Sequence, residues 1–265
     1  TLARHFSTAR SHPTAEIYQP LLHGTRMSTH IETAVGVDAC PIGWLATIFD
    51  TNGIRTEAYE EFGELRRVYN DADRILVDIP IGFPKDERRR CDEDARELLG
   101  SRGSSVFYPP CRAAAEQDVY AEASKAHKKQ IGHGLSQQAY SISEKILEVT
   151  DAVGEEYEGV VREAHPELCF AALNGQPIAY SKSTDWGRGL RMKLLEDELD
   201  SAEEHYLDVR DEYLLKEVRR DDILDSMVLA IAGREPSPAT VPSDPLPTEP
   251  RIYYPEFHVP KYEKA

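Results

Sequence analysis

The sequence predicts a single α/β domain, and three features of its apolar pattern support this prediction. Two apolar runs flank Asn52-Gly53, a short apolar run ends at Ile79, and later segments repeat apolar residues at helical spacing. Short apolar runs bounded by turn residues indicate strands, whereas a period of three to four residues indicates a helix. A chain of 265 residues has room for one sizeable core. We therefore expect one domain over residues 31–256, between tails formed by residues 1–30 and 257–265.

The strands are expected near the start of this domain. Residues 34–38 and 44–49 are apolar runs, and residues 54–59 form a third run after Asn52-Gly53. Because Asn-Gly tolerates the positive φ of a type I′ turn, the second and third runs are predicted to form a hairpin. Residues 74–79 are then predicted to form a buried strand, which the following prolines bring to an end.

Helices are expected in most of the remaining chain. Phe62, Leu65 and Val68 lie three residues apart and predict a short helix before the fourth strand. Further along the chain we expect a charged helix over 86–99, a loop over 101–112, a helix over 135–153, a strand ending at 160–161, a helix over 168–173, and two helices between 189 and 219. A last helix is expected from Asp221 through Ile231.

The ends of the chain carry weaker patterns. Residues 1–29 show no sustained period, and Met27 is a candidate for the native start, which would make residues 1–26 an extension outside the fold. After Gly233, dense prolines predict an extended connection over the surface, and residues 251–254 then predict a terminal edge strand.

Composition narrows the class of protein. No apolar run approaches the roughly 18 residues of a membrane span, so we expect no membrane association. The formal net charge of -16 repels a bare polyanion and argues against wide, sequence-independent nucleic-acid binding, so any nucleic-acid contact must be local. A solvated surface adapted to high salt explains this charge, and an acidic-ligand or basic-partner role is the alternative.

The cysteine and histidine patterns bear on compartment and metal type. Cys40, Cys91, Cys111 and Cys169 are widely separated and form no Cys-x-x-Cys pair, so we expect a reducing cytoplasm. The nine histidines show no His-x-x-x-His spacing, which argues against zinc.

Two aspartates follow predicted strands. Asp38 closes the run from Val35 to Val37, and Asp78 closes the run from Ile75 to Val77. The ends of strands line the ligand crevice in open α/β sheets. An ionised carboxylate buried there costs several kcal/mol, of order ~3–5, unless a cation or hydrogen-bond donors compensate it. Each aspartate alone is equally well explained as a turn or helix cap, but the pair together indicates a cation site.

The start of the last helix carries three more acids. Asp221 is explained as its N-cap, and Asp222 gains from the helix dipole. Asp225 lies beyond the first positions, so it most needs a partner, either a cation or an arginine in a structural salt bridge. Helical spacing places Asp221, Asp222 and Asp225 along one side of the first turn.

Other polar residues are weaker candidates. Glu167 follows Pro166 at a helix start, where an acid is favoured in any case, and His165 is read as a capped turn residue in preference to a proton shuttle. Loop donors that could bind a phosphate are Arg102, Ser104, Ser105, Arg112 and Lys182. No dinucleotide, P-loop or nucleophile-elbow glycine motif occurs, which counts against those three enzyme classes.

The order of these motifs resembles one known family. The motifs are Val-Gly-Val-Asp-Ala-Cys-Pro-Ile-Gly-Trp-Leu (35–45), Val-Asp-Ile-Pro-Ile-Gly-Phe-Pro (77–84), Arg-Gly-Ser-Ser-Val-Phe-Tyr-Pro-Pro-Cys-Arg (102–112), Gly-Leu-Ser-Gln-Gln (134–138), His-Pro-Glu (165–167), Ser-Lys (181–182) and Asp-Asp-Ile-Leu-Asp-Ser (221–226). Over about residues 34–254 the chain resembles the domain-of-unknown-function family 429, described as predicted RNase H-like nucleases. The resemblance implies a ribonuclease H-like fold: a mixed sheet, with its first three strands antiparallel, flanked by helices.

The last motif also looks like the final catalytic helix of Holliday-junction-resolving relatives, in which two aspartates three apart precede a small, apolar helix. Asp222 and Asp225 match that spacing, and Ser226 stands where the pattern usually has Ala. The family label supplies no substrate, because it rests on the fold.

The main hypothesis is a divalent-metal-dependent nuclease. Its catalytic and metal-binding acids would be Asp38, Asp78, Glu167, Asp222 and Asp225, and they would hold one or two Mg²⁺ or Mn²⁺ ions. Arg112 and Lys182 would neutralise charge on the substrate phosphate. One alternative is a metal-dependent hydrolase or phosphotransferase acting on a small nucleotide or phosphorylated metabolite, and another is a non-catalytic binding protein with this fold. The sequence is compatible with a homo-oligomer. It does not distinguish DNA, RNA, a junction or a small nucleotide as the substrate.

Overall fold

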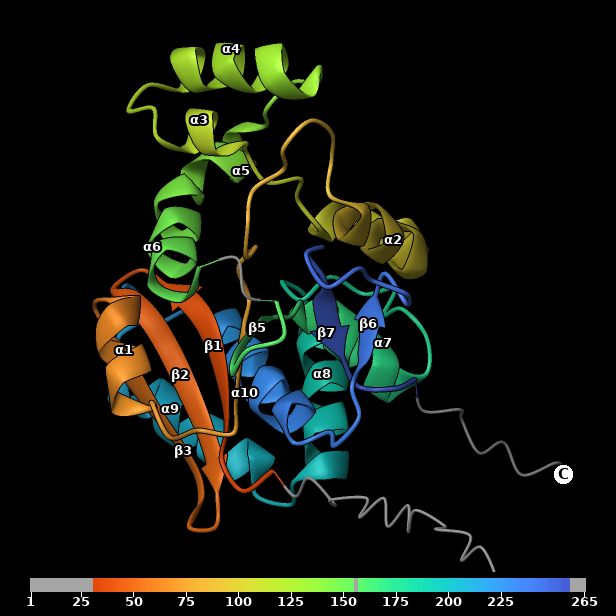
Figure 1. The fold of residues 1–265 in the computed structure, drawn as a ribbon. Helices are drawn as coiled ribbons and strands as arrows, with labels where there is room; N and C mark the ends of the chain where they lie inside the picture. The colour runs from red at the N-terminus through yellow and green to blue at the C-terminus, as the bar shows by residue number, and fades with distance from the viewer. Residues whose placement is uncertain (1–30, 155–156, 258–265) are drawn as a thin grey trace, which may run out of the picture.

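The computed structural model describes residues 31–154 and 157–257, and a mixed five-stranded sheet lies at its centre (Figure 1). The strand order is β3-β2-β1-β4-β5. The strands are β1 (Ala34–Cys40), β2 (Gly43–Asp50), β3 (Gly53–Tyr59), β4 (Arg74–Val77) and β5 (Val161–Glu163). The first three strands are antiparallel, while β4 is parallel to both β1 and β5. The α/β class and the antiparallel start of the sheet are confirmed, and the sheet is consistent with the ribonuclease H-like fold.

The hairpin between β2 and β3 is confirmed, with its turn one residue earlier than predicted. Asp50 pairs with Gly53, so Thr51 and Asn52 form the turn. Gly53 has φ of 110°, a conformation that residues with a Cβ rarely adopt. The Asp50 carboxylate accepts a hydrogen bond from the Asn52 backbone N–H at 2.7 Å. A side chain that bonds to the backbone two residues further on closes such a turn locally.

Ten α-helices, one 3₁₀ helix and a second small sheet complete the described part of the chain. The helices are α1 (Phe62–Val68), α2 (Arg90–Leu99), the 3₁₀ helix η1 (Gly100–Ser105), α3 (Arg112–Ala115), α4 (Tyr120–Ile131), α5 (Gln137–Ser141), α6 (Ser143–Val153), α7 (Pro166–Asn174), α8 (Asp185–Glu198), α9 (Ala202–Glu212) and α10 (Arg220–Gly233). The small sheet pairs β6 (Ala239–Val241) with β7 (Ile252–Tyr254). None of the helices described is long and apolar enough to cross a membrane.

Several predicted boundaries were wrong. The helix expected over 135–153 is two helices, because Ile142 leaves the helical conformation between α5 and α6. The charged helix begins at Arg90 and not at residue 86, since Arg89 has an extended backbone and turns its side chain into the interior. A strand begins at Val161, where we expected one to end. Helix α4 was not predicted, because its buried residues, Ala123, His127 and Ile131, are too few and too polar to stand out in the sequence.

The two faces of the sheet are covered by different helices. Alternation along β2 sends Trp44 and Ala46 to one face, where they pack with α1 and α6, and sends Leu45 to the other face. That second face packs against α10, whose residues from Asp222 to Gly233 are all buried. The predicted terminal strand is confirmed as β7, although it pairs with β6 and meets the main sheet only at an isolated bridge between Tyr253 and Ala164.

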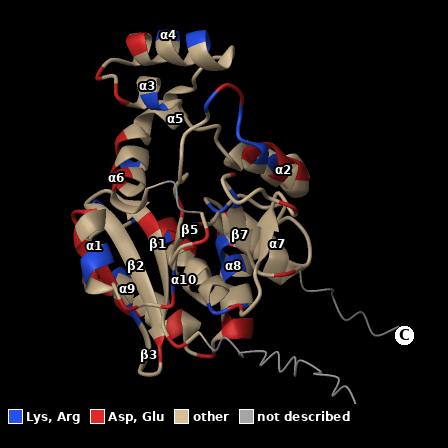
Figure 2. Cartoon of the chain, in the orientation of Figure 1, with Lys and Arg blue, Asp and Glu red and all other residues tan. Residues whose placement is uncertain are grey.

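A lobe made of α3, α4 and α5 stands apart from the sheet (Figure 1). It has an apolar cluster of its own, formed by Cys111, Ala114, Ala123, Ile131, Leu135 and Ala139. Acidic and basic residues both occur along α1, α2 and α4, so the negative charge is not gathered on one of these helices (Figure 2). The expected N-terminal tail lies outside the described residues, and so does the expected C-terminal tail apart from Phe257.

Candidate metal centre

Parallel pairing of β1 and β4 brings two aspartates to the same edge of the sheet. Val37 pairs with Val77, so Asp38 and Asp78 each follow the last paired residue of the two strands. The backbone N–H of Asp78 donates to the carbonyl of Val37 at 2.9 Å, which continues the ladder by one step. Because both strands run in the same direction, their carboxyl ends meet at one crevice.

Helix α10 supplies the third acid by packing unusually close to β1. A Cβ atom on Gly36 would lie 2.1 Å from the Ser226 carbonyl oxygen and 2.2 Å from the Ala230 nitrogen, so only glycine fits. The Ser226 hydroxyl also bonds to the Thr47 hydroxyl of β2 at 2.8 Å. These contacts fix the neighbouring Asp225, and one carboxylate oxygen from each of Asp38, Asp78 and Asp225 lies within 4.8 Å of the other two.

These carboxylates lie in an environment that opposes their charge. Burial, followed by the charges of Asp78, Asp225 and Asp222, raises the pKa of Asp38 well above its ordinary value. Burial likewise raises the pKa of Asp78, and it raises the pKa of Asp225 to about 6 although Lys182 acts in the opposite direction. Among the described residues, no hydrogen-bond donor reaches the Asp38 carboxylate. Three crowded carboxylates of this kind, two of them buried and that of Asp78 half-buried, could hold a metal ion.

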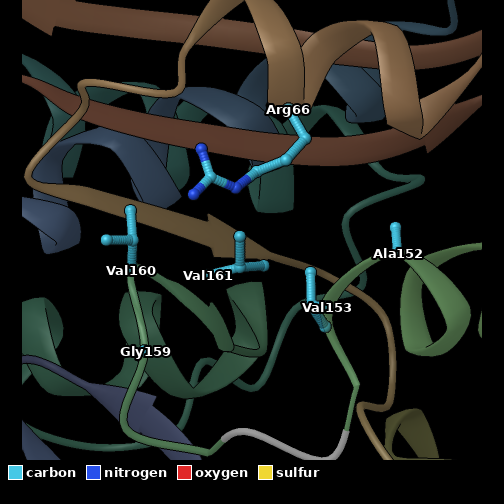
Figure 3. A pocket seen from close by; sticks show the side chains of 6 residues that line it. All are labelled: Arg66, Ala152, Val153, Gly159, Val160 and Val161. Carbon is cyan, nitrogen blue, oxygen red and sulfur yellow. The ribbon is translucent and has the colours of Figure 1, made fainter.

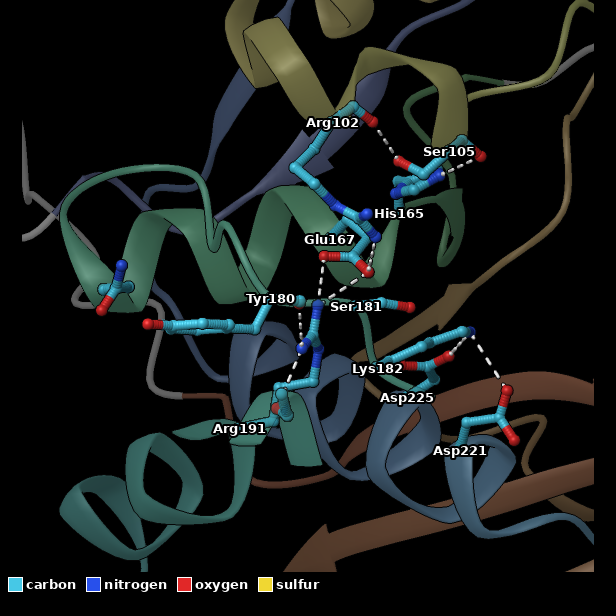
Figure 4. Close-up of polar contacts among 12 residues, drawn as sticks. Arg102, Ser105, His165, Glu167, Tyr180, Ser181, Lys182, Arg191, Asp221 and Asp225 are labelled. Carbon is cyan, nitrogen blue, oxygen red and sulfur yellow. Dashed lines mark hydrogen bonds and ion pairs between the residues drawn. The ribbon is translucent and has the colours of Figure 1, made fainter. Parts of the chain in front are cut away.

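Lys182 is the cation nearest to this cluster. Its Nζ atom lies 2.5 Å from Asp225 Oδ2 and 3.5 Å from Asp221 Oδ2, as Figure 4 shows. The sequence left open a salt bridge from Asp225 to an arginine, and the partner is this lysine. Burial lowers the pKa of Lys182, but Asp225 and Asp38 together hold it above its ordinary value, so the ammonium stays charged.

The roles expected for the other two acids of α10 are reversed. The N-cap is Arg219, not Asp221, and Asp222 Oδ2 accepts a hydrogen bond from the Arg219 backbone N–H at 2.8 Å. Asp222 is therefore the acid that caps the helix. Burial raises its pKa to about 6 against this hydrogen bond. Asp221 is half-exposed and faces Lys182.

Glu167 lines the same cavity as Asp38, Asp78 and Asp225, and two arginines contact its carboxylate. Arg191, which is fully buried in α8, donates to both Glu167 carboxylate oxygens at 2.8 and 2.6 Å. Arg102 approaches the same carboxylate at 3.5 Å, so Glu167 lies between two guanidinium groups (Figure 4). Both contacts come from one guanidinium nitrogen, and charge-assisted hydrogen bonds of this kind are roughly twice as strong as neutral ones. The sequence offered no signal for Arg191, because its partner lies 24 residues away on another helix.

The predicted phosphate-binding residues separate into two groups. Arg102, Ser105 and Lys182 line the cavity that contains the acids. Arg112 and Ser104 do not line it, and Arg112 instead pairs with Asp151 at 3.1 Å and lies over the Phe83 ring.

His165 lies at the wall of the same cavity. Its Nε2 is 3.3 Å from the Ser105 carbonyl, and its Nδ1 is buried with no hydrogen-bond partner among the described residues. The His165 ring therefore contacts the backbone of Ser105, whereas the sequence favoured a capped turn residue over a proton shuttle.

The cavity around the acids has a volume of about 520 Å³, within the range of about 300–1,000 Å³ of small-molecule sites. All five predicted acids line it.

A second cavity, of about 150 Å³, lies beside β5 and is lined by Arg66 and five residues with small or aliphatic side chains (Figure 3). Arg66 there donates to the Tyr69 carbonyl at 3.3 Å. With no acid in its lining, this second cavity offers no ligands to a cation.

The chain was compared with known proteins. The model of a family described as protein of unknown function (DUF429) matches residues 36–249. No curated protein and no solved structure matches the chain.

Proposed function

The chain belongs to the DUF429 family of proteins of unknown function, and from that premise we propose that it is a divalent-metal-dependent nuclease that hydrolyses phosphodiesters. The observation that supports this proposal is the meeting of Asp38, Asp78 and Asp225 within 4.8 Å at the end of the sheet. Two strand ends and one helix converge on that point. A structural role alone gives no reason to collect three carboxylates there.

The charges around this point favour a cation. Asp38, Asp78, Asp222 and Asp225 line one cavity, in which the basic residues are Lys182, Arg102 and Arg219, and the Lys182 ammonium is the group that pairs with Asp225. Burial and mutual repulsion raise the pKa of Asp38, so ionising all of these acids is costly unless more positive charge is present. Asp38 and Asp78 have no cationic side chain in an ion pair among the described residues, and we assign both, with Asp225, as ligands.

The donor set suits a hard cation. Carboxylate oxygens are the ligands that Mg²⁺ and Mn²⁺ prefer, and the site has no cysteine or histidine ligand of the kind zinc favours. When bound, one or two such ions would activate water and stabilise the leaving oxygen. Asp222 is the remaining acid of α10 that could join as a ligand, whereas the contacts of Glu167 with Arg191 and Arg102 favour a role in positioning the cavity wall.

Basic residues of the same cavity would bind the substrate phosphate. Lys182 and Arg102 line it together with the hydroxyl of Ser105, and we assign the phosphate contact to them in place of Arg112. Guanidinium and ammonium groups stabilise the negative charge that develops on a reacting phosphoryl group. Because the net charge of the chain is -16, these contacts would act locally and not along an extended polyanion.

A second candidate function is favoured by the shape of the site. A cavity of about 520 Å³, partly open to solvent, is large enough for a small nucleotide or phosphorylated metabolite, so a hydrolase or phosphotransferase with the same metal is the alternative.

The four cysteines are free and buried, which supports the expectation of a reducing, cytoplasmic location.

Two measurements test the proposal. Mn²⁺ or Mg²⁺ titrated against thermal unfolding should raise the midpoint of the wild type, because an ion that binds only the folded state stabilises it. The Asp225→Asn variant should lose this shift, while Asp118→Asn, at an exposed position away from the cavity, should keep it. Single strands, duplexes, junctions and nucleotides should then be offered with Mn²⁺ to the wild type and to both variants.

The outcomes separate the candidates. Cleavage of a polymer by the wild type and not by Asp225→Asn supports the nuclease, whereas turnover of nucleotides alone supports the alternative. No thermal shift at millimolar metal together with no turnover contradicts both and favours the non-catalytic binding protein.

A further inference from the structure

Phe107 is an exposed aromatic side chain inside the acidic cavity. It follows η1 and is 37% exposed. Ten large hydrophobic side chains are exposed in the described part of the chain, and among them Phe107 alone lines this cavity. It belongs to none of the four apolar core clusters. Ligand sites combine apolar and aromatic lining with a few placed polar groups, and Phe107 gives this cavity an aromatic group of that kind.

The backbone on both sides of Phe107 is held firmly. Val106 is buried in a core cluster with Cys91, Ala95 and Leu99, and its carbonyl accepts a hydrogen bond from Arg96 at 2.5 Å. The ring of Tyr108 lies under two guanidinium groups, with Arg88 at 4.0 Å and Arg96 at 4.9 Å from its centroid. Buried Pro109 and Pro110 follow. The chain around Phe107 is thus held by named contacts, while Phe107 itself is exposed and lines the cavity, so its exposure is not the result of a loose loop.

The cavity combines two kinds of lining. Ile79, Pro80 and Ile142 join Phe107 as apolar lining, while Lys182 and Arg102 can receive phosphate. A nucleotide has the same two parts, an apolar base with two flat faces and an anionic phosphate. Stacking of a base on an aromatic ring is favourable for every base, because each base has a π face.

From these observations we propose that Phe107 is a stacking platform for one unpaired nucleobase. The cavity then takes a single nucleotide unit, either free or at the end of a single strand. This inference rests on the proposed function, which places the phosphate at Lys182 and Arg102. A base inside a duplex has both faces covered by its neighbours, so it must leave the stack before it can contact Phe107.

Binding to matched ligands tests the platform. AMP and ribose 5-phosphate carry the same phosphate and sugar, and only AMP carries a base. With Mn²⁺ present, calorimetry should show that the wild type binds AMP at least about 10-fold more tightly than ribose 5-phosphate. Phe107→Ala should remove this preference by weakening AMP alone, and Phe107→Trp should keep it. Trp186→Ala removes an exposed aromatic ring that lies outside the cavity and should change neither affinity.

Each outcome decides the proposal. Equal weakening of both ligands by Phe107→Ala, no effect of this variant, or no binding of AMP at millimolar concentration would overturn it. A short single-stranded oligonucleotide serves as a second probe: if Phe107→Ala weakens its binding as well, the unit is a strand end, and if only AMP binds, it is a free nucleotide. If the protein prefers AMP but shows no metal-dependent cleavage, the proposed function is contradicted and the stacking role of Phe107 is supported. If it cleaves its substrate but shows no preference for AMP, the stacking role is contradicted and the proposed function is supported.

Discussion

Lys182 and Asp225 form an ion pair at 2.5 Å across 43 residues of sequence. The loop between α7 and α8 carries the lysine, and the buried first half of α10 carries the aspartate, which is only 2% exposed at its side chain. The pair supplies one positive charge to a cavity that also contains Asp38, Asp78 and Asp222. One ammonium therefore compensates only part of the negative charge.

Removing Lys182 should show how much its ion pair stabilises the metal-free protein and how far a bound ion can replace it. Lys182→Ala leaves Asp225 buried without its partner, and because the lysine is partly exposed we expect a loss of about 1–3 kcal/mol of unfolding free energy in EDTA. Saturating Mn²⁺ should shrink this deficit, since the ion supplies positive charge at the same place. Urea unfolding with and without Mn²⁺ measures both values.

The matched control for this prediction is Lys193→Ala, whose partner Asp197 is exposed, with an expected loss below about 0.5 kcal/mol. Unchanged stability of Lys182→Ala in EDTA, or a deficit that Mn²⁺ leaves at full size, would argue against this role for the ion pair.

Neutralising Asp38 should stabilise the metal-free protein and abolish its response to metal. The pKa of Asp38 is raised by burial and by neighbouring carboxylates, so its ionised form at pH 8 destabilises the folded state. We expect Asp38→Asn to gain about 1 kcal/mol or more in EDTA and to lose the Mn²⁺-induced rise in melting temperature. Differential scanning calorimetry at pH 8 measures both. A destabilised Asp38→Asn protein that still responds to Mn²⁺ would contradict the ligand assignment.

Asp222 should give the metal-free protein a defined pH dependence. Its pKa is about 6 in the folded state, above the ordinary aspartate value of 3.8, so between these two pH values the folded state binds more protons than the unfolded state. The unfolding free energy of the wild type should fall as pH rises through this window, by about 1–3 kcal/mol from this group. Asp222→Asn keeps an oxygen to accept the Arg219 N–H, so its stability relative to the wild type should rise from pH 4 to 6 and then level off. Chemical unfolding in EDTA at each pH tests this, and the opposite trend would mean that the hydrogen bond outweighs burial.

The close approach of α10 to β1 should tolerate no side chain at Gly36. Gly36→Ala places a Cβ atom 2.1 Å from the Ser226 carbonyl, so the helix must move away from the strand. We expect a loss of about 3 kcal/mol or more of unfolding free energy and a smaller Mn²⁺-induced shift, because Asp225 moves with the helix. Gly63→Ala in α1 is the control: a Cβ there meets nothing within 4 Å, and alanine favours a helix. Equal stability of the two variants would show that the packing is looser than these contacts indicate.

Local patterns were enough to locate the acids at the sheet edge. The apolar runs that end at Asp38 and Asp78 specify strands, and the run after Asp225 specifies a buried helix, because burial of apolar side chains drives both. The assignment of Asp221 as the N-cap was wrong. Helix α10 starts one residue earlier than expected, and the backbone of Arg219 decides which carboxylate can reach it.

The sequence by itself determined the α/β class, the hairpin between the second and third strands and the acids that end two strands, since these depend on periodicity and turn residues along short segments. The antiparallel pairing of all three first strands was expected from the family resemblance. Only the tertiary structure decided the partners: Lys182 for Asp225, Arg191 for Glu167, and Asp151 for Arg112. The exposure of Phe107 within the cavity was decided in the same way. These relationships join residues from loops and helices with no common period, so no local pattern encodes them. They follow from the packing of α8 and α10 and from the contacts that hold the loop after η1.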